Sequence, residues 1–289
     1  MLTHAEIRNY LARLGIQDIC KPSLEFLTEI HKAHVENLSW QTIDIVAGRP
    51  APMDIRSSVD LILNGRSGYC FQLNSAFGQL LHSLGYNVSW HRAGVQPTGQ
   101  KPCINSFHLG LTVTLPNEHE KPQQWIVDVG LGDMPYEPLP LVPGHYNQGG
   151  FEYTVVPSNV TEGGWRLEHD PLAAYVGVDY APQSLENLNE FLPKHEFYSY
   201  SPESPWLNLF LIRHRHASGS NELRGCIWSK REGTSIEKEE VATKSQWLEV
   251  LGDVFHEKLV SYSKLAQDEL WKKVYGFHEE WKRSKQVVK

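Results

Sequence analysis

The sequence predicts an α+β protein, because the spacing of its apolar residues changes twice along the 289-residue chain. Up to about Gly85, apolar residues recur every three or four positions, as on one face of a helix. From there to roughly Pro193, they alternate with polar residues in short runs that Gly, Pro and Thr interrupt, which is typical of strands. The last third mixes both patterns. We therefore expect a helical region over 1–85, an all-β region over 86–193 and a mixed region over 194–289.

Four helices are expected in the first region, and each has a recognisable start. Thr3 and Glu6 form a capping box ahead of the first helix. Ser23 and Asp54 are suitable N-caps for the second and third helices. The fourth begins at or near Cys70, and an apolar stripe marks its buried face: Leu73, Phe77, Leu80, Leu81 and Leu84. The region is therefore expected to be a helical bundle.

The clearest strand of the second region covers 107–115, with His108 on its polar face. A polar stretch centred near Glu118 follows, and a second strand is expected over 125–129, so the two strands suggest a hairpin. Residues equally distant from the centre then face each other. This places His108 directly opposite Asp128, with Cβ atoms about 5 Å apart. A slip of one residue would send the two side chains to opposite faces.

The third region is expected to contain two strands and two helices. The strand-like runs cover 207–212 and 223–228. Helical apolar spacing covers 245–255 and 265–277. A basic stretch over 281–285 is expected to be a solvated helix end and not a membrane or nucleic-acid contact.

Composition and charge exclude several classes of protein. The net charge is −7, and no basic stripe is long enough to neutralise nucleic-acid phosphates. No stretch approaches the roughly 20 apolar residues of a membrane span, and the N-terminus lacks the features of a signal peptide. The four cysteines never form a C-x-x-C pair, so we expect no disulfides and no zinc site: Cys20, Cys70, Cys103 and Cys226. The expectation is a cytoplasmic protein that acts on small molecules without a metal; the oligomeric state is left open.

Cys70 has the position of a nucleophile. It follows the glycine-punctuated loop 64–69 and begins a helix, where the helix dipole is expected to lower the pKa of a thiol. His108 and Asp128 follow in the chain order of a nucleophile, a base and a residue that orients the base. His214 and His216 could suggest a metal, but without a third ligand nearby a solvated strand edge is expected.

Several motifs resemble those of the arylamine N-acetyltransferases. Residues 66–74 (RSGYCFQLN) resemble the nucleophile motif of that family, residues 106–109 its histidine strand, and residues 127–133 its aspartate motif. Further similarity covers 35–38 and 197–206, so that the resemblance extends over about two-thirds of the chain.

The resemblance implies a fold, a reaction and a set of site residues. The fold is a helical bundle, a central β-barrel and a C-terminal α/β lid around a cysteine-protease-like Cys-His-Asp core. The implied reaction is a two-step exchange: Cys70 attacks the thioester of acetyl-CoA, coenzyme A leaves, and an aromatic amine or hydrazine takes the acetyl group. His108 would hold the thiolate as an imidazolium and Asp128 would fix the ring. Acetyl-CoA is then a cosubstrate, and the amine belongs to the metabolism of foreign compounds.

The resemblance also assigns supporting roles and marks two departures. Gly130 and Gly132 would allow the backbone to approach the coenzyme. Arg66 would pair with Glu36 and support the cysteine loop. Ser67 stands where the family has a second glycine, so the turn is expected to be strained if that position needs a positive φ. In the later motif, Tyr200 replaces a small hydroxyl residue, which affects the expected pocket.

Three other functions are compatible with these residues. An acyltransferase of the same fold could take a larger acyl group. A papain-like or transglutaminase-like hydrolase would also use a Cys-His-Asp set, because such sets recur on unrelated folds. A binding module for an aromatic ligand would leave Cys70 unreactive.

Overall fold

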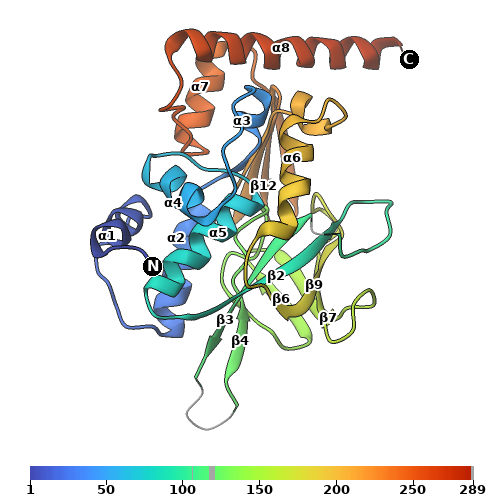
Figure 1. Cartoon of the computed structure of the whole chain (residues 1–289). Helices are drawn as coiled ribbons and strands as arrows, with labels where there is room; N and C mark the ends of the chain where they lie inside the picture. The colour runs from blue at the N-terminus through green and yellow to red at the C-terminus, as the bar shows by residue number, and fades with distance from the viewer. Residues whose placement is uncertain (106, 117–120, 288–289) are drawn as a thin grey trace.

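The computed structural model describes residues 1–105, 107–116 and 121–287. Helices near the N-terminus pack beside a curved sheet, and a second sheet carries helices at the C-terminal end of the chain (Figure 1). The expected α+β class is therefore confirmed, with a helical bundle, a nearly closed β-barrel and an α/β lid. Within the described residues, every helix is too short or too polar to cross a membrane.

All four predicted helix starts of the first region are confirmed. The helices are α1 (His4–Arg13), α2 (Leu24–Asn37), α3 (Ile43–Val46), α4 (Ile55–Leu63) and α5 (Cys70–Ser83). Thr3 and Glu6 form the capping box of α1, and the side chains of Ser23 and Asp54 cap α2 and α4. Gly85 closes α5 at φ +96°, a conformation that favours glycine. The short helix α3 was not predicted.

Helix α5 lies at the centre of the bundle. Most of its residues are buried, and it packs against α4 and against strands β2 and β3 of the barrel. Within the apolar stripe, Leu73, Phe77, Leu80 and Leu81 have no exposed surface, and Leu84 is partly buried. Since each such side chain contributes about 1.5–3 kcal/mol on burial, the first turn of α5 is firmly held.

An eight-stranded antiparallel sheet forms the barrel, in the order β5-β4-β3-β2-β9-β8-β7-β6. Its strands are β2 (Asn87–Gln96), β3 (His108–Leu115), β4 (Gln123–Ile126), β5 (Leu139–Pro140), β6 (Gly144–Gln148), β7 (Phe151–Pro157), β8 (Trp165–His169) and β9 (Gly177–Ser184). One face of β3 packs on the helices through Leu109, Leu111 and Val113, and the other face lines the barrel.

The predicted hairpin register is wrong by two residues. Thr112 of β3 pairs with Ile126 of β4, which places Asp128 opposite Gly110 and not opposite His108. Because side chains alternate with a period of two, this shift leaves His108 and Asp128 on the same face, where they meet diagonally. The expected turn around Glu118 lies outside the described residues, as does Ser106 of the histidine motif.

The lid sheet has the order β1-β10-β11-β12-β13. Its strands are β1 (Trp40–Gln41), β10 (Leu211–Arg215), β11 (Gly219–Arg224), β12 (Ile227–Glu232) and β13 (Ser235–Glu240). The helical segments around it are η1 (Asn189–Phe191), α6 (Leu192–Tyr200), η2 (Pro205–Asn208), α7 (Lys244–Asp253) and α8 (Lys264–Val287). Strand β1 comes from the helical region and pairs with β10, which ties the two ends of the chain together.

The predictions for the third region are partly wrong. The expected single strand 223–228 is divided between the end of β11 and the start of β12, and a hairpin turn joins them in which Gly225 adopts φ +60°. The expected strand 207–212 begins only at Leu211, because Pro205 starts a 3₁₀ turn first. Both predicted helices are present as α7 and α8, and α8 extends beyond its predicted end. The division of the chain at residues 85 and 193 stays a prediction.

Candidate active site

Three segments bring Cys70, His108 and Asp128 together. Cys70 is the first residue of α5, His108 is the first residue of β3, and Asp128 follows β4. His108 Nε2 lies 2.5 Å from Asp128 Oδ2, and both side chains are fully buried. A Cβ added at Gly130 would lie 3.1 Å from Cys70 Cα and 3.1 Å from His108 Cε1, so the two residues flank this glycine.

The Asp128 carboxylate receives four hydrogen bonds. Besides His108, the Asn74 amide (2.7 Å) and the Gly130 N–H (2.9 Å) donate to Oδ1, and the Tyr180 hydroxyl (2.9 Å) donates to Oδ2. Burial alone raises the pKa of Asp128, but the His108 charge and the hydrogen bonds from His108 and Asn74 lower it below its ordinary value. Asp128 is therefore ionised and fixes the proton of His108 on Nε2.

This arrangement leaves His108 Nδ1 free. The atom is buried, and it has no hydrogen-bond partner among the described residues. A nitrogen with its lone pair directed into the site is a base that can accept a proton from a nearby thiol.

The Cys70 thiol is buried, and its surroundings favour the neutral form over the thiolate. It is 1% exposed, and Sγ donates a weak hydrogen bond to the Phe107 carbonyl at 3.7 Å. Burial, together with the negative charge of Asp128, raises the pKa of Cys70 above its ordinary value. The predicted lowering by the helix dipole is therefore wrong in direction, because loss of solvation outweighs the dipole. A thiolate at Cys70 has to arise by transfer of its proton to His108.

The sequence did not identify Asn74 and Tyr180 as site residues. Asn74 follows Cys70 by one helical turn, so the i, i+4 spacing placed both on one face of α5 and was an available signal. Asn74 also accepts a hydrogen bond from the Val129 N–H at 3.0 Å, which holds the aspartate motif against the helix. Tyr180 lies far along the chain on β9, and no local pattern marks it.

Each glycine of the site has a packing reason to be glycine. A Cβ at Gly130 would lie 2.6 Å from the Asn74 amide nitrogen. A Cβ at Gly132 would overlap Arg213, and Gly132 has φ +78°. At Gly110, opposite Asp128, a Cβ would overlap the ring of Tyr180. The coenzyme contacts expected of Gly130 and Gly132 stay a prediction.

Aromatic rings lie next to the thiol on the side of α6 and η2. Phe107, whose carbonyl accepts from Cys70, packs edge-on against Tyr198 (centroids 5.1 Å apart) and Trp206 (5.8 Å). Tyr198 stacks on Trp206 at 4.4 Å, and burial raises its pKa. Tyr69 also packs on Trp206, at 5.2 Å.

A small cavity of about 190 Å³ lies beside Gly132, between the aspartate motif and the lid sheet. Three basic residues line it. Arg213 is paired with Glu222 (2.8 Å) and Arg231 with Asp170 (2.9 Å), whereas Lys238 has no ion pair with a described carboxylate. The cavity therefore combines the backbone of Gly132 with the positive charge of Lys238.

The prediction that His214 and His216 lie on a solvated strand edge is wrong for His214, whereas His216 follows β10 and its side chain is 25% exposed. His214 is buried in the interior strand β10, where its Nε2 bonds to the Glu36 carbonyl at 2.7 Å. The described residues contain no group of three or more His, Cys, Asp or Glu side chains arranged to hold a metal ion.

Comparison with known proteins identifies the family. A profile of N-acetyltransferases matches residues 23–264 of the chain. The chicken arylamine N-acetyltransferase of the pineal gland, isozyme NAT-3, is 32% identical over 63% of this chain and 62% of its own length. The chain belongs to the arylamine N-acetyltransferase family. The Salmonella typhimurium arylamine N-acetyltransferase / N-hydroxyarylamine O-acetyltransferase is 31% identical over 43% of this chain and 42% of its own length. The aligned segments thus span about two-fifths to three-fifths of these relatives.

Solved arylamine N-acetyltransferases share the fold. The enzyme from Mycobacterium abscessus superposes with a TM-score of 0.79 at 22% identity, over 93% of this chain and 94% of its own. The Mycobacterium marinum enzyme in complex with CoA superposes with a TM-score of 0.79 at 21% identity, over 93% of this chain and 98% of its own. The helical bundle, barrel and lid are thus the arylamine N-acetyltransferase fold.

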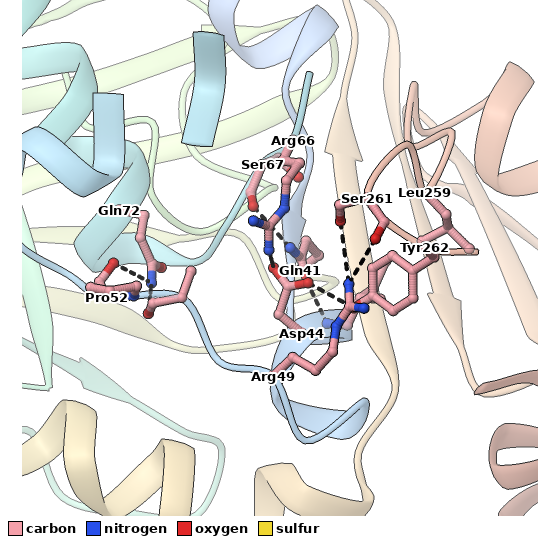
Figure 2. A network of polar contacts seen from close by, with 12 residues as sticks. Gln41, Asp44, Arg49, Pro52, Arg66, Ser67, Gln72, Leu259, Ser261 and Tyr262 are labelled. Atoms are coloured by element: carbon pink, nitrogen blue, oxygen red, sulfur yellow. Dashed lines mark hydrogen bonds and ion pairs between the residues drawn. The ribbon is translucent and has the colours of Figure 1, made fainter. Parts of the chain in front are cut away.

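One supporting role inferred from the arylamine N-acetyltransferases is wrong. Arg66 does not pair with Glu36, which instead accepts a hydrogen bond from Tyr136. Figure 2 shows Arg66 beside Asp44, at 2.8 Å between Nη2 and Oδ2. Asp44 also accepts from the Tyr262 hydroxyl at 2.7 Å, so one carboxylate links the cysteine loop to the lid.

The cysteine loop is held by amide side chains on both sides (Figure 2). Gln41 Nε2 donates to the Ser67 carbonyl at 2.9 Å. Gln72 Oε1 accepts from the Tyr69 N–H at 3.1 Å, and Gln72 Nε2 donates to the Ala51 carbonyl at 3.1 Å. These bonds fix the backbone immediately before Cys70.

The two departures from the arylamine N-acetyltransferase pattern have different outcomes. Ser67 is not in the positive-φ region, so the strain expected there is absent; its hydroxyl lies 3.4 Å from the buried Glu257 carboxyl. Tyr200 ends α6 and is 63% exposed.

Proposed function

We propose that this chain is an acetyl-CoA-dependent arylamine N-acetyltransferase with Cys70, His108 and Asp128 as its catalytic triad. The observation that carries the proposal is the state of His108, whose Nε2 is committed to Asp128 while the buried Nδ1 has no described partner. A binding module would need no such free base on a residue that flanks the same glycine as a buried cysteine. Family membership supplies the reaction class.

In the first half-reaction, His108 Nδ1 takes the proton of Cys70 as Sγ attacks the thioester carbonyl carbon of acetyl-CoA. The bond between that carbon and the coenzyme sulfur breaks, and the coenzyme thiolate leaves with the proton from His108. Asp128 stabilises the imidazolium between these steps. The product is an acetyl group on Cys70.

In the second half-reaction, the nitrogen of an aromatic amine or hydrazine attacks the acetyl carbon on Cys70. His108 Nδ1 accepts a proton from that nitrogen, and the bond to Sγ breaks. The proton returns to the sulfur, so Cys70 and His108 are restored and an amide is released.

The surroundings of the triad support both substrates. Phe107, Tyr198 and Trp206 next to the thiol offer ring faces and edges to an aromatic acceptor. Gly132 and the basic cavity beside it suit the anionic coenzyme donor. All four cysteines are unpaired, which supports a reducing compartment such as the cytoplasm.

The test is the intact mass of the protein after mixing with acetyl-CoA in the absence of an amine. We expect the gain of one acetyl group, mapped to Cys70, that disappears when an arylamine is added. The variant Cys70→Ser should gain no stable acetyl group, and Cys226→Ser, which changes another buried cysteine, should behave as the wild type. Acylation by a larger acyl-CoA only, or by no donor, would contradict the proposal.

A further inference from the structure

The segment between α7 and α8 brings a buried carboxyl group to the cysteine loop. Glu257 is 6% exposed, and its Oε2 lies 3.4 Å from the hydroxyl of Ser67, three residues before Cys70. Its Oε1 accepts a hydrogen bond from the Leu259 N–H at 2.9 Å. Figure 2 shows the following residues of the same segment, Leu259 to Tyr262, beside the network that holds the cysteine loop. The triad itself does not account for a buried acid at this position.

The backbone on both sides of Glu257 is held in an unfavourable conformation. His256 has φ +55° and Leu259 has φ +50°, and in the part of the chain that the structure describes they are the only residues other than glycine with a positive φ. Such backbone strain concentrates at functional positions, because the surrounding structure has to maintain it. The Glu257 N–H is in turn fixed to the Leu251 carbonyl of α7 at 2.8 Å. The fold therefore maintains strain where it holds this side chain against the cysteine loop.

Charged groups from three other segments face the Glu257 carboxyl: Arg13 at the end of α1, Asp44 in α3 and Arg66 in the cysteine loop. Both guanidinium groups are used to hold the loop. Arg66 pairs with Asp44 at 2.8 Å, and Arg13 Nη2 donates to the Arg66 carbonyl at 3.1 Å. Arg13 Nε is buried and has no hydrogen-bond partner among the described residues. From the same segment as Glu257, the Tyr262 hydroxyl donates to Asp44 at 2.7 Å.

The protonation state of Glu257 decides how these groups are shared. Burial raises the pKa of Glu257 to about 7, so both states occur near neutral pH. The neutral acid leaves Arg66 to Asp44 and leaves Arg13 to the loop carbonyl. The carboxylate attracts both guanidinium groups and repels Asp44, because charges interact strongly where water is excluded. Ionisation of Glu257 therefore competes with the two contacts that hold the loop ahead of Cys70.

We propose that Glu257 is a positioning residue that acts on Cys70 through the cysteine loop: the neutral carboxyl group leaves Ser67 and the Arg66 ion pair in place, and the carboxylate displaces them. This inference rests on the proposed function, because acetylation of Cys70 is the step that the loop controls. Ser67 stands where the arylamine N-acetyltransferase pattern has a glycine, which has no hydroxyl group. The contact with Glu257 is therefore a feature of this chain.

The experiment compares the wild type with Glu257→Gln, which keeps the size of the side chain but cannot ionise. Acetylation of Cys70 at saturating acetyl-CoA is followed by rapid quenching and mass at several pH values between about pH 6 and pH 8, on both sides of the Glu257 pKa. We expect the ratio of the wild-type rate constant to the variant rate constant to fall about fivefold over this range. Titration of His108 or of the donor affects both proteins equally and cancels in the ratio.

The amplitude of acetylation separates positioning from stability. The amplitude counts the molecules that are folded, whereas the rate constant reports how Cys70 is placed in them. Ser67→Ala is a second variant, which removes the hydroxyl contact and leaves Glu257 able to ionise. The ratio of the wild type to Ser67→Ala should also fall as the pH rises. Glu237→Gln makes the same chemical change at an exposed position of β13, and its rate constant should follow that of the wild type at every pH.

The outcomes distinguish this inference from the proposed function. A ratio of wild type to Glu257→Gln that stays constant with pH, with or without a change in amplitude, would overturn the positioning role and leave the proposed function intact. A wild type that gains no acetyl group at any pH would overturn the proposed function and the positioning role together.

Discussion

At the level of single residues, the proposed mechanism requires the site to generate its nucleophile by transfer of the Cys70 proton to His108. Cys70 is 1% exposed, and burial raises its pKa, so the thiol has no tendency to ionise alone. For Asp128, hydrogen bonds outweigh the effect of burial on the pKa, because four donors keep the carboxylate ionised. The two effects together make His108 the acceptor of the thiol proton.

Replacing Asp128 by Asn tests this balance. The Asn amide would donate to His108 Nε2 and move the ring proton to Nδ1, where it blocks proton transfer from Cys70. We expect the rate of Cys70 acetylation to fall by about three orders of magnitude. Asp179→Asn is the control, since Asp179 is equally buried but pairs with Arg166 in the barrel. A fall of less than tenfold in Asp128→Asn would show that Asp128 does not set the tautomer.

Tyr180→Phe removes one of the four donors to Asp128 and leaves the other three in place. We expect a loss of about tenfold in the acetylation rate, well short of the Asp128 variant, because a single hydrogen bond to a charged group is removed. A rate equal to that of the wild type would mean that the Tyr180 hydroxyl is not needed in the site.

Glu257 is predicted to make stability depend on pH. Burial raises its pKa to about 7, above the ordinary value of 4.5. The folded state therefore keeps Glu257 protonated where the unfolded chain is ionised, and the stabilisation present below about pH 4.5 is lost as the pH rises to about 7. In Glu257→Gln we expect this loss to disappear, so that the variant exceeds the wild type by about 3 kcal/mol in free energy of unfolding at pH 8. Urea unfolding of both proteins at pH 5 and pH 8 measures this difference in the free energy of unfolding.

The control for that measurement is Glu237→Gln. Glu237 is exposed on β13, so its replacement should leave the pH dependence as in the wild type. If Glu257→Gln keeps the pH dependence of the wild type, Glu257 is ionised in the folded protein and accepts the hydrogen bond of the neutral Ser67 hydroxyl as a carboxylate.

At the level of elements, glycine decides where strands can approach one another. Gly110 of β3 lies opposite Asp128, and the Tyr180 ring occupies the space that a Cβ would need. We expect Gly110→Ala to lower the free energy of unfolding by about 2 kcal/mol, because the ring has to move. Gly252→Ala in α7, where a Cβ meets open space, is the matched control and should change stability by less than 1 kcal/mol or raise it. Equal effects in both variants would contradict the packing argument.

The sequence was most informative where local chemistry decides an element. The caps at Thr3, Ser23 and Asp54 are side-chain to backbone bonds within one turn, so the helix starts could be predicted. The strand pair around His108 and Asp128 could be predicted by face but not by register. Which face of the sheet a side chain lies on follows from the alternation of residues along a strand. The register depends on the turn and on packing elsewhere in the barrel.

Long-range contacts could not be predicted from local patterns. Segment 223–228 has apolar residues before and after Gly225, at Leu223 and at Ile227 and Trp228, and only the pairing of β11 with β12 shows that it contains a turn between two strands. The resemblance implied an ion pair between Arg66 and Glu36, whereas in the structure Arg66 pairs with Asp44. The shift of the Cys70 pKa is upward because segments distant in the sequence bury the thiol. The position of Cys70 at a helix start carries no information about this burial.

At the level of the whole molecule, the helical region and the barrel share one apolar core. Leu109, Leu111 and Val113 of β3 pack in the same cluster as Leu73 and Phe77 of α5. Trp206 of η2 joins it, and β1 crosses from the helical region into the lid sheet. The active site lies where these parts meet.

Because of this shared core, we expect the fragment 1–85 not to fold on its own. Without β3 it loses the apolar surface that covers α5, and the remaining burial is too small for a stable domain. Circular dichroism and urea unfolding should show a cooperative transition for the full chain and none for the fragment. A cooperative transition in the fragment would show that the division at residue 85 is a boundary between independent domains.

The burial of Cys70 also affects how the resting protein withstands oxidation. Peroxides react with exposed thiolates, and a shielded thiol that keeps its proton is a poor target. Cys20 is exposed and is the first cysteine that a diffusible oxidant meets. A diffusible oxidant is therefore expected to modify Cys20 at the surface before it reaches the buried sulfur of Cys70.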